Sequence, residues 1–326
     1  MERVLSGLRP TGRIHIGNYF GALVNWVRFQ DEYKCFYEVA DWHALTTMYP
    51  ESKKFRGLIR ETVLDWLTVG IDPEKSVLFV QSDVKEHAEL HLLFSMLVTI
   101  PRLQRNPTIK EVVKDLHMED KISYGLLGYP VLQASDVLIY RPQKVPIGED
   151  QLPHLELTRE IARRFNHLYG ETFPEPEPIL TKTKRIPGID GRKMSKSYGN
   201  AIYITEPPEE VEKKIMQAFT DPEKIKKDDP GHPEGCVVFA YRSAIDEDGT
   251  KDLEKKCRAG EIGCVQCKRE TAKIMNEFLD KFRKRREELK SVDVNSILKE
   301  GAEKAREFAR ETMQIVRERM GMWSRD

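Results

Sequence analysis

The first half of the chain alternates short apolar runs with segments whose apolar residues recur at helical spacing. Three runs, at 3–8, 35–40 and 76–82, are dense in Val, Leu and Phe, as buried strands are. The segments 17–30 and 52–70 have the apolar spacing of helices. Strands that alternate with helices predict βαβ units, and therefore an α/β fold with a doubly wound parallel sheet.

The strand pattern fades after about residue 204. A helix before that point, at 149–170, ends on Gly170, and the Pro-rich segment 173–179 is expected to be a linker. We expect a Rossmann-like α/β domain over 1–204 and a helical domain over 205–326. Amphipathic helices with mixed charges are expected at 209–219, 268–290 and 299–320.

Length and composition agree with this division but do not indicate a partner. A chain of 326 residues is longer than one compact core usually holds, so two domains are expected. Lys plus Arg equals Asp plus Glu at 53 each, which leaves room for a local basic patch but gives no net charge. The sequence has no apolar stretch long enough for a membrane span and no signal-peptide core, so a cytoplasmic protein is expected.

The first candidate site is the turn at 9–23, which follows the first expected strand and leads into a helix. Gly12 and Gly17 allow a tight turn, and His15 and Asn18 add hydrogen-bond donors. Unpaired amides at the start of a helix favour phosphate, so this turn is a candidate nucleotide site. It is neither a G-x-G-x-x-G motif nor a P-loop. Taken alone, it is equally compatible with a structural turn and a packed histidine.

The second candidate is the segment 191–197, "GRKMSKS", which combines three cations with two hydroxyl groups. A lone run of this kind is typical of a solvated loop. The two segments together resemble the paired signatures of the class I aminoacyl-tRNA synthetases, which end in HIGH and KMSKS. Here the first signature reads "HIGN" at 15–18, with Asn18 in place of the last His, and the second reads "KMSKS" at 193–197.

The resemblance implies the formation of an aminoacyl adenylate from ATP with Mg²⁺. The reaction needs no protein nucleophile, because the enzyme aligns the reactants and stabilises charge on phosphate oxygens. His15 and Asn18 would contact the phosphates, and Lys193 and Lys196 would close over them as the catalytic residues. The segment 145–151 resembles the family's ribose contact. The implied ATP-binding residues are Arg9, Pro10, Thr11, Gly17, Asn18, Gly148, Glu149, Asp150, Ile186, Lys193, Met194, Ser195, Lys196 and Ser197.

The resemblance covers nearly the whole chain and points to the enzymes for tryptophan and tyrosine. On a helix over 129–136, Tyr129, Gln133 and Asp136 share one face. An ionised Asp136 would accept the indole N–H of tryptophan, but the tyrosine hydroxyl also donates, so Asp136 does not separate the two substrates. Tyr129 and Gln151 would hold the α-amino group by the same resemblance.

Other residues favour tryptophan. At position 133 the chain has Gln, the residue type found in the tyrosine enzymes. However, Leu5 stands where those enzymes have a tyrosine. The segment "ADWHALT" at 40–46 resembles the tryptophan enzymes, which implies that His43 lies near the substrate. We therefore expect L-tryptophan and tRNA(Trp) as substrates. The alternatives are a tyrosine enzyme of the same fold and a non-catalytic, synthetase-like RNA-binding or iron–sulfur protein. The implied tryptophan-binding residues are Leu5, His43, Tyr129, Gln133, Asp136, Val145, Ile147 and Gln151.

Four of the five cysteines lie close together as C-x20-C-x6-C-x2-C. Four thiolates with a closing C-x2-C suit a tetrahedral zinc ion or an iron–sulfur cluster. Some bacterial tryptophan enzymes have a [4Fe–4S] cluster on a similar motif with a slightly longer first gap. The resemblance therefore implies a [4Fe–4S] cluster, with structural zinc as the alternative. The expected ligands are Cys236, Cys257, Cys264 and Cys267.

The family also implies partners for two further regions. The helical domain would face the tRNA anticodon, where the basic segment 281–290 is either a phosphate contact or an ordinary solvated helix face. The polar, helix-like segment 98–121 would form a homodimer interface. The histidines of "HAELH" at 87–91 are one turn apart on an expected helix, but they do not form a known metal motif and are expected to be structural.

Overall fold

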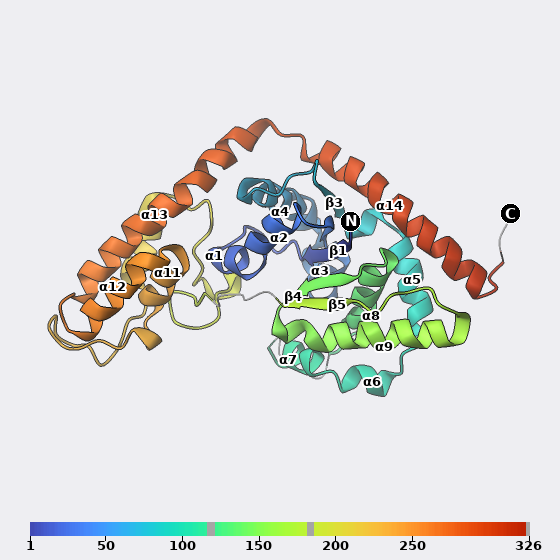
Figure 1. Cartoon of the computed structure of the whole chain (residues 1–326), viewed down its shortest axis with the longest axis horizontal. Coiled ribbons are helices and arrows are strands. Elements are labelled where there is room, and N and C mark those ends of the chain that lie inside the picture. The colour runs from blue at the N-terminus through green and yellow to red at the C-terminus, as the bar shows by residue number, and fades with distance from the viewer. Residues whose placement is uncertain (116–120, 181–185, 324–326) are drawn as a thin grey trace.

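The computed structural model describes residues 1–115, 121–180 and 186–323. Its centre is a parallel sheet of five strands in the order β3-β2-β1-β4-β5, which confirms the predicted α/β fold (Figure 1). The order of the strands reverses between β1 and β4, and such a switch point is where doubly wound sheets bind ligands. The strands are β1 (Arg3–Leu8), β2 (Lys34–Val39), β3 (Ser76–Val80), β4 (Lys144–Ile147) and β5 (Glu177–Leu180).

The sheet separates two apolar cores, because successive side chains of a strand point to opposite faces. Val4 and Tyr37 face a core with α2 (Val24–Phe29) and α4 (Phe55–Val69). In that core the ring of Trp26 stacks on Tyr37, with their centroids 4.4 Å apart. The opposite core contains the buried side chains of Leu5, Phe36, Val77 and Phe79, packed on α5 (Glu86–Ser95), α8 (Tyr124–Ile139) and α9 (Leu152–Tyr169).

Two strands were not expected from the sequence. β4 has four residues and includes Pro146, so its apolar run is too short to stand out. β5 lies partly inside the segment 173–179, which was wrongly expected to be a linker. Its Pro178 is compatible with a strand because β5 is at the edge of the sheet, where a missing N–H disrupts less of the ladder.

The first helical segment is less regular than the expected helix at 17–30. It begins as α1 (Ile16–Asn18), widens into a π-helical turn at Tyr19–Leu23, and continues as α2. Such π-turns are frequent at functional sites because they change which side chains face the ligand. Similarly, α4 is preceded by a 3-10 turn at Tyr49–Lys54, within the expected helix at 52–70.

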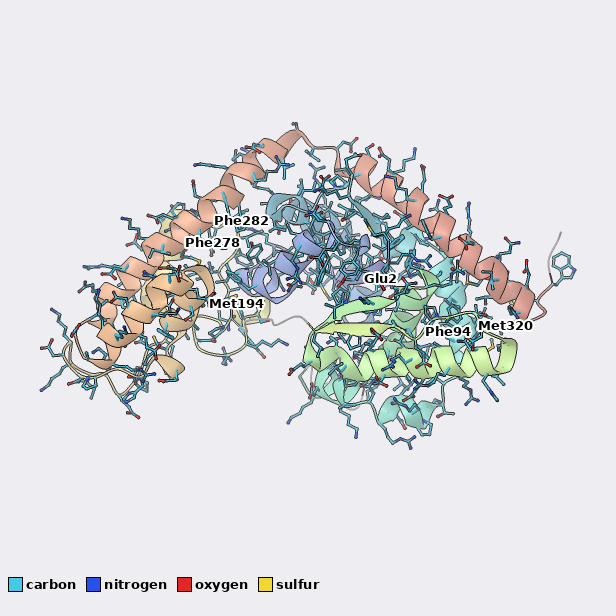
Figure 2. The ribbon with its side chains drawn as sticks, viewed as in Figure 1. Glu2, Phe94, Met194, Phe278, Phe282 and Met320 are labelled. Atoms are coloured by element: carbon cyan, nitrogen blue, oxygen red, sulfur yellow. The ribbon has the colours of Figure 1, made fainter. Side chains whose placement is uncertain are left out.

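Most helices after residue 204 lie at one side of the sheet (Figure 1). The long α13 (Cys264–Glu288) connects them to the first helical segment, because the ring of Phe282 meets Tyr19 with centroids 5.0 Å apart. Phe278 and Met194 lie at the same junction (Figure 2). The remaining helices are α3 (Asp41–Met48), α6 (Ile100–Gln104), α7 (Pro107–Asp115), α10 (Pro208–Gln217), α11 (Val237–Ile245), α12 (Glu247–Arg258), α13 (Cys264–Glu288) and α14 (Val294–Arg319).

The last helix, α14, returns to the sheet and packs along its edge strand β3 (Figure 1). At Gly301 the helix backbone is so close that an added Cβ would overlap the carbonyl oxygen of Leu78. Arg317 then pairs with Glu89 of α5, with Nε 2.8 Å from the carboxylate. By packing, α14 belongs with the sheet, although it follows the helical region in sequence.

The expected dimer segment 98–121 contains α6 and α7, and its residues 116–120 lie outside the described part of the chain. Within the described residues, none of the helices is long and apolar enough to cross a membrane.

Candidate active site

Two cavities lie at the carboxyl end of the sheet, beside the switch point between β1 and β4. The first, of about 420 Å³, is lined by Leu5, Glu38 and Asp136 among others, and we call it the Asp136 cavity. The second, of about 460 Å³, is lined by His15, Asn18 and the loop after Ile186, and we call it the His15 cavity. The turn from Arg9 to His15 runs from one cavity to the other.

His15 and Asn18 of the first signature form a reciprocal cap at the start of α1. The Nδ1 atom of His15 accepts the backbone N–H of Asn18 at 3.2 Å, and Oδ1 of Asn18 accepts the backbone N–H of His15 at 3.3 Å. Because Nδ1 is an acceptor, the ring proton lies on Nε2. Burial and the charge of Lys196 lower the pKa of His15 to about 4, so it is a neutral donor at physiological pH.

Glycine is required at two positions in this turn. Gly12 has a φ of +111°, which side-chain-bearing residues rarely adopt. A Cβ on Gly17 would lie 3.0 Å from Nδ1 of His15, so a larger residue would push the capping ring away. The two glycines therefore keep the His15 cavity open beside the backbone.

The structure brings the second signature against the first. The Nζ of Lys196 donates to the carbonyl oxygen of Gly12 at 2.7 Å and to Oγ1 of Thr11 at 3.1 Å. Burial lowers the pKa of Lys196 to about 8, although the nearby Asp65 carboxylate opposes this effect. The backbone behind Lys196 also joins the two regions, since the N–H of Ile16 donates to the carbonyl of Ile202 at 2.9 Å.

The loop of the second signature is shaped by a buried asparagine. Asn200 accepts the N–H of Ser195 at 2.8 Å and donates to the carbonyl of Lys193 at 3.1 Å. Lys193 is exposed and Met194 is buried, and both line the His15 cavity together with Ile186. The backbone of Lys196–Tyr198, which includes Ser197, forms a short 3-10 turn.

Asp65 holds the backbone of the turn that precedes His15, and the sequence did not predict this role. Its Oδ2 accepts the backbone N–H of Ile14 at 2.7 Å, and its Oδ1 lies 2.9 Å from the guanidinium of Arg286 in α13. Burial raises the pKa of Asp65 to about 6, against the effect of the Ile14 N–H and Arg286. The only sequence signal is a carboxylate among the apolar residues of the helix at 52–70.

Asp136 is the polar centre of the other cavity. Its carboxylate accepts from Nε2 of His43 at 2.7 Å, from Nδ1 of His87 at 2.6 Å, and from the amide of Gln81 at 2.8 and 2.9 Å. Burial alone would raise the pKa of Asp136, but hydrogen bonds from the two histidines outweigh it and hold the pKa well below its usual range. Asp136 is therefore ionised.

His87 and Gln81 reach Asp136 from segments that the sequence did not connect with it. His87 was expected to be one of a structural pair with His91, yet it contacts Asp136 and, through Nε2, the hydroxyl of Tyr140 at 2.7 Å. Nothing in the local sequence distinguishes such a residue from a packed histidine. Its role depends on α5 and α8 lying side by side.

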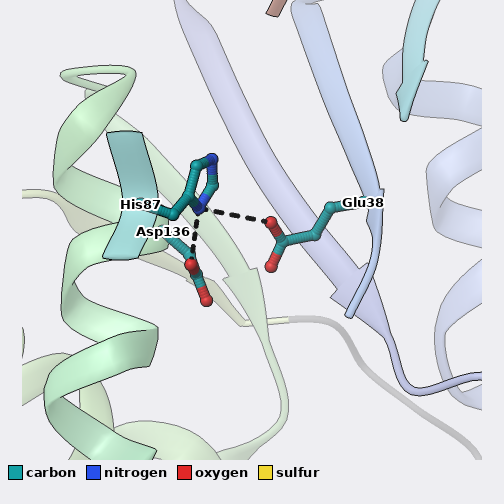
Figure 3. Close-up of side chains that lie close together, drawn as sticks. All are labelled: Glu38, His87 and Asp136. Atoms are coloured by element: carbon teal, nitrogen blue, oxygen red, sulfur yellow. Dashed lines mark hydrogen bonds and ion pairs between the residues drawn. The ribbon is translucent and has the colours of Figure 1, made fainter. Parts of the chain in front are cut away.

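Glu38 also lines the Asp136 cavity and was not expected there. It lies on β2, with its Oε2 3.9 Å from Nδ1 of His87 (Figure 3). Burial, together with the negative charges of Asp136 and Asp41, raises the pKa of Glu38 well above its usual range. A lone carboxylate inside the apolar run at 35–40 was the available signal.

Several of the other residues expected at the substrate sites line the Asp136 cavity, whereas Pro10, Thr11, Glu149 and Asp150 line neither cavity. The hydroxyl of Tyr129 is 3.0 Å from Nε2 of His154, and the amide of Gln151 donates to Asp150 at 2.9 Å. Glu149–Gln151 form a 3-10 turn after β4; Gln151 lines the Asp136 cavity, whereas Glu149 and Asp150 are exposed and are not among the residues that line it. The Asp136 cavity is also lined by Leu5, Arg9, Gln133, Val145, Ile147 and Gly148.

The four clustered cysteines lie around the starts of α11 and α13 and on α12. They are close enough to affect one another: burial, followed by the charges of Cys236 and Cys257, raises the pKa of Cys267 to about 12. Among the described residues, no three of these sulfur atoms lie within 4.8 Å of one another. Cys35 is separate and buried in the sheet.

Comparison with known proteins identifies similar chains. The family model of the class I tRNA synthetases (W and Y) matches residues 1–280. A tryptophan–tRNA ligase of Thermotoga maritima is 52% identical over 98% of this chain and 99% of its own length. One of Aquifex aeolicus is 46% identical over 98% of this chain and all of its own length. The tryptophanyl-tRNA synthetase of Campylobacter jejuni, solved with ADP and tryptophan, superposes with a TM-score of 0.85 at 36% identity, over 98% of this chain and all of that one.

Proposed function

Because the chain belongs to the class I tRNA synthetases of the tryptophan and tyrosine group, we propose that it is a tryptophan–tRNA ligase. The observation that carries this proposal is the contact between the two signatures. Lys196 reaches the turn that His15 caps, and the same turn begins at Arg9, which lines the Asp136 cavity. Since tRNA is charged in the cytoplasm, the proposal includes that location.

The reaction has two steps. The carboxylate of tryptophan attacks the α-phosphorus of ATP, and pyrophosphate leaves to give tryptophanyl-adenylate. A ribose hydroxyl at the 3′ end of tRNA(Trp) then attacks the carbonyl carbon of the adenylate, and AMP leaves. Neither step needs a covalent enzyme intermediate, so the residues act by alignment and by stabilising charge.

The residues around the His15 cavity have the chemistry for phosphate binding. The Nε2–H of His15 donates without adding charge. Lys193, which lines the cavity, and Lys196, which contacts the turn at Gly12, supply cations from a separate loop. An ATP phosphate would replace the carbonyl of Gly12 as the partner of Lys196. This exchange would draw the two signatures onto the nucleotide.

Mg²⁺ would supply further positive charge to the phosphates during the reaction. Within the described residues, the one group of three metal-ligand side chains is Glu38, His87 and Asp136, which lies in the Asp136 cavity. The His15 cavity therefore has no carboxylate cage of its own among those residues. The ion would be held mainly by the nucleotide.

Tryptophan-dependent exchange of pyrophosphate into ATP tests the function directly. Purified protein is assayed with tryptophan and with tyrosine in parallel reactions. Exchange with tryptophan alone supports the proposal. Exchange with tyrosine alone would show that Gln133, rather than Leu5, indicates the substrate, and no exchange with either would favour the non-catalytic alternative.

A [4Fe–4S] cluster on the four cysteines is a further part of the proposal. On a single zinc ion, thiolates bound at about 2.3 Å lie roughly 3.8 Å apart. Among the described residues, no three of these sulfur atoms lie within 4.8 Å of one another, so they do not form a preformed tetrahedral zinc site. The cluster would hold the thiols as thiolates and brace α11, α12 and α13.

The cluster is tested by its colour and composition. Protein purified without oxygen should be brown, with about four irons and four sulfides per chain. Cys267→Ser should lose the colour, whereas Cys35→Ala should keep it. A colourless protein with one zinc per chain would instead establish a structural zinc site.

The remaining parts of the proposal concern tRNA and a second subunit. We assign residues 1–204, together with α14, to the catalytic part, and the rest of 205–326 to the anticodon side. The segment 98–121 would pair with its copy in a homodimer. Exposed apolar side chains beside and within this segment, including Met96 and Ile100, support such an interface.

A further inference from the structure

Asp65 is a carboxylate that lines neither cavity, yet it acts on both signatures. It lies on α4 and is 1% exposed. Its Oδ2 accepts the backbone N–H of Ile14, the residue before His15, at 2.7 Å. Its negative charge stabilises the ammonium of Lys196, which reaches Gly12 in the same turn. A carboxylate this deeply buried needs a partner of opposite charge to stay ionised.

The partner comes from α13. The guanidinium of Arg286 lies 2.9 Å from Oδ1 of Asp65, and its other terminal nitrogen pairs with Glu61, one turn earlier on α4. The side chain of Arg286 is itself largely buried in this bridge. An opposite charge at this distance favours the ionised form of a carboxyl group. Arg286 therefore opposes the effect of burial on Asp65.

A second arginine of α13 approaches the same region without meeting Asp65. The Nε of Arg283 donates to the backbone carbonyl of Glu206 at 2.7 Å. That carbonyl follows the segment whose Ile204 N–H donates to the carbonyl of Ile14 at 3.1 Å. The two arginines thus hold α13 against the turn in different ways. Arg286 pairs with a charge, and Arg283 binds backbone.

The turn and the lysine each require something that this carboxylate supplies. The buried N–H of Ile14 requires an acceptor, and the partly buried Lys196 requires a counter-charge. We propose that Asp65 and Arg286 are positioning residues of the ATP site. Asp65 fixes the turn before His15 and is the counter-charge of Lys196. Arg286 keeps that carboxylate ionised in its buried position. The inference rests on the proposed function, because it takes the His15 cavity to be the phosphate site.

The charges around this pair agree with the assignment. Burial has the largest effect on both groups: it raises the pKa of Asp65 to about 6 and lowers the pKa of Lys196 to about 8. Both are therefore charged between these values, where each stabilises the other. The other titratable groups that face them are Glu61 of the same helix, Arg13 of the turn, Arg286 of α13 and the neutral His15.

The pH dependence of pyrophosphate exchange tests the counter-charge. Without the charge of Asp65, nothing opposes the effect of burial, so the pKa of Lys196 falls. In Asp65→Asn the alkaline decline of kcat/KM for ATP should move to lower pH by roughly half a unit to one unit. Asparagine keeps an oxygen for the Ile14 N–H, so the turn is retained. The KM for tryptophan should change by less than about twofold, since Asp65 does not line the Asp136 cavity.

Three further proteins assign the effect. Arg286→Met leaves Asp65 without its cation, so the carboxyl group takes up a proton and the decline moves in the same direction, by no more than in Asp65→Asn. Arg283→Met is the matched control from the same helix and should leave the decline in place. Lys196→Arg combined with Asp65→Asn should show no alkaline decline, because a guanidinium stays charged in this range.

Several results would overturn the inference. They are an unchanged decline in Asp65→Asn, an equal shift in Arg283→Met, or a decline that persists in the double variant. If Asp65→Asn does not fold, the shift in Arg286→Met has the same meaning, because that variant keeps the aspartate side chain. A failure of the proposed function is distinct, since unaltered protein would then not exchange pyrophosphate with tryptophan at any pH.

Discussion

Lys196 combines a cationic side chain with partial burial, and this combination makes its charge sensitive to pH. With its pKa lowered to about 8, the free enzyme loses this charge as the pH rises through that value. Below pH 8 the ammonium is present to meet phosphate, and above it the attraction is lost. Above this pH, the turn at Thr11 and Gly12 no longer has a positively charged lysine beside it.

We therefore expect kcat/KM for ATP in pyrophosphate exchange, at saturating tryptophan, to fall above about pH 8. Lys196→Arg is the control, since a guanidinium stays charged throughout this range. Its activity should be lower overall but without the decline near pH 8. A decline of equal size in the arginine variant would assign the titration to another group.

Asn18 has two separable roles, as a cap for α1 and as a neighbour of the phosphates. Asn18→Ala should lose about 1 kcal/mol in the free energy of unfolding, because the cap to His15 is removed. Asn18→Asp keeps an oxygen for the cap but places a negative charge in the His15 cavity.

The aspartate variant should therefore unfold close to the unaltered protein in urea, yet lose exchange activity on the order of 100-fold. Urea titration and pyrophosphate exchange on the same preparations separate the two roles. Equal losses of stability and activity in both variants would mean that Asn18 serves the cap alone.

Among individual site residues, the sequence predicted those that belong to local motifs. His15, Asn18 and Lys196 were found because each lies in a short signature, and the structure brings them together. Glu38 and Asp65 were missed because each is a carboxylate flanked by apolar residues of its element, with no recognisable motif around it. Their neighbours come from other parts of the chain, and no spacing within one segment indicates them.

Among the helices and strands, Gly301 decides how closely α14 meets β3. Alanine is favoured over glycine inside a helix by up to about 1 kcal/mol. At Gly301, however, a methyl group would overlap the backbone of Leu78, which cannot move without disturbing the strand. Packing and helix propensity therefore predict opposite signs for Gly301→Ala.

We expect packing to dominate, so that Gly301→Ala lowers the free energy of unfolding by about 2 kcal/mol. Gly57→Ala is the matched control, because Gly57 is also helical and a Cβ there would meet no atom within 4 Å. It should be neutral or slightly stabilising. Denaturant unfolding of the two variants checks both signs, and a stabilised Gly301→Ala would show that α14 is not held tightly to β3.

The elements themselves were predictable where their patterns were long. β1 and α9 were found almost to the residue, because apolar density or helical spacing marks them clearly. β4 and β5 were missed because each has four residues and contains a proline. The π-helical turn after α1 has no sequence pattern of its own, since it depends on how that segment packs.

For the whole molecule, the exposed apolar side chains near α6 predict association. Met96 and Ile100 are 66% and 61% exposed. Burial of such apolar side chains against a second subunit would lower the free energy of the assembly. We expect a dimer by size-exclusion chromatography with light scattering. Met96→Asp with Ile100→Asp should shift it towards monomer, whereas Leu168→Asp, at an exposed apolar site on α9, should not. Dimers that persist in the double variant would place the interface elsewhere.

The division of the chain into two parts was only partly predictable. Helical patterns after residue 204 suggested a separate region, and α10 to α13 do gather at one side of the sheet. The sequence of α14 resembles those helices in its charges and spacing. Only its small buried residues, Gly301, Ala302 and Ala305, distinguish a helix that lies against a strand.

The return of α14 to β3 also has a consequence for synthesis on the ribosome. The edge of the sheet is made early, but the helix that covers it is among the last segments to emerge. At a synthesis rate of about 5 to 20 residues per second, the delay is on the order of 10 to 40 seconds. During this time the nascent chain exposes an unpaired strand edge, which is a site for aggregation. Chaperone binding before release should therefore concentrate on nascent chains that have passed β3 and not yet reached α14.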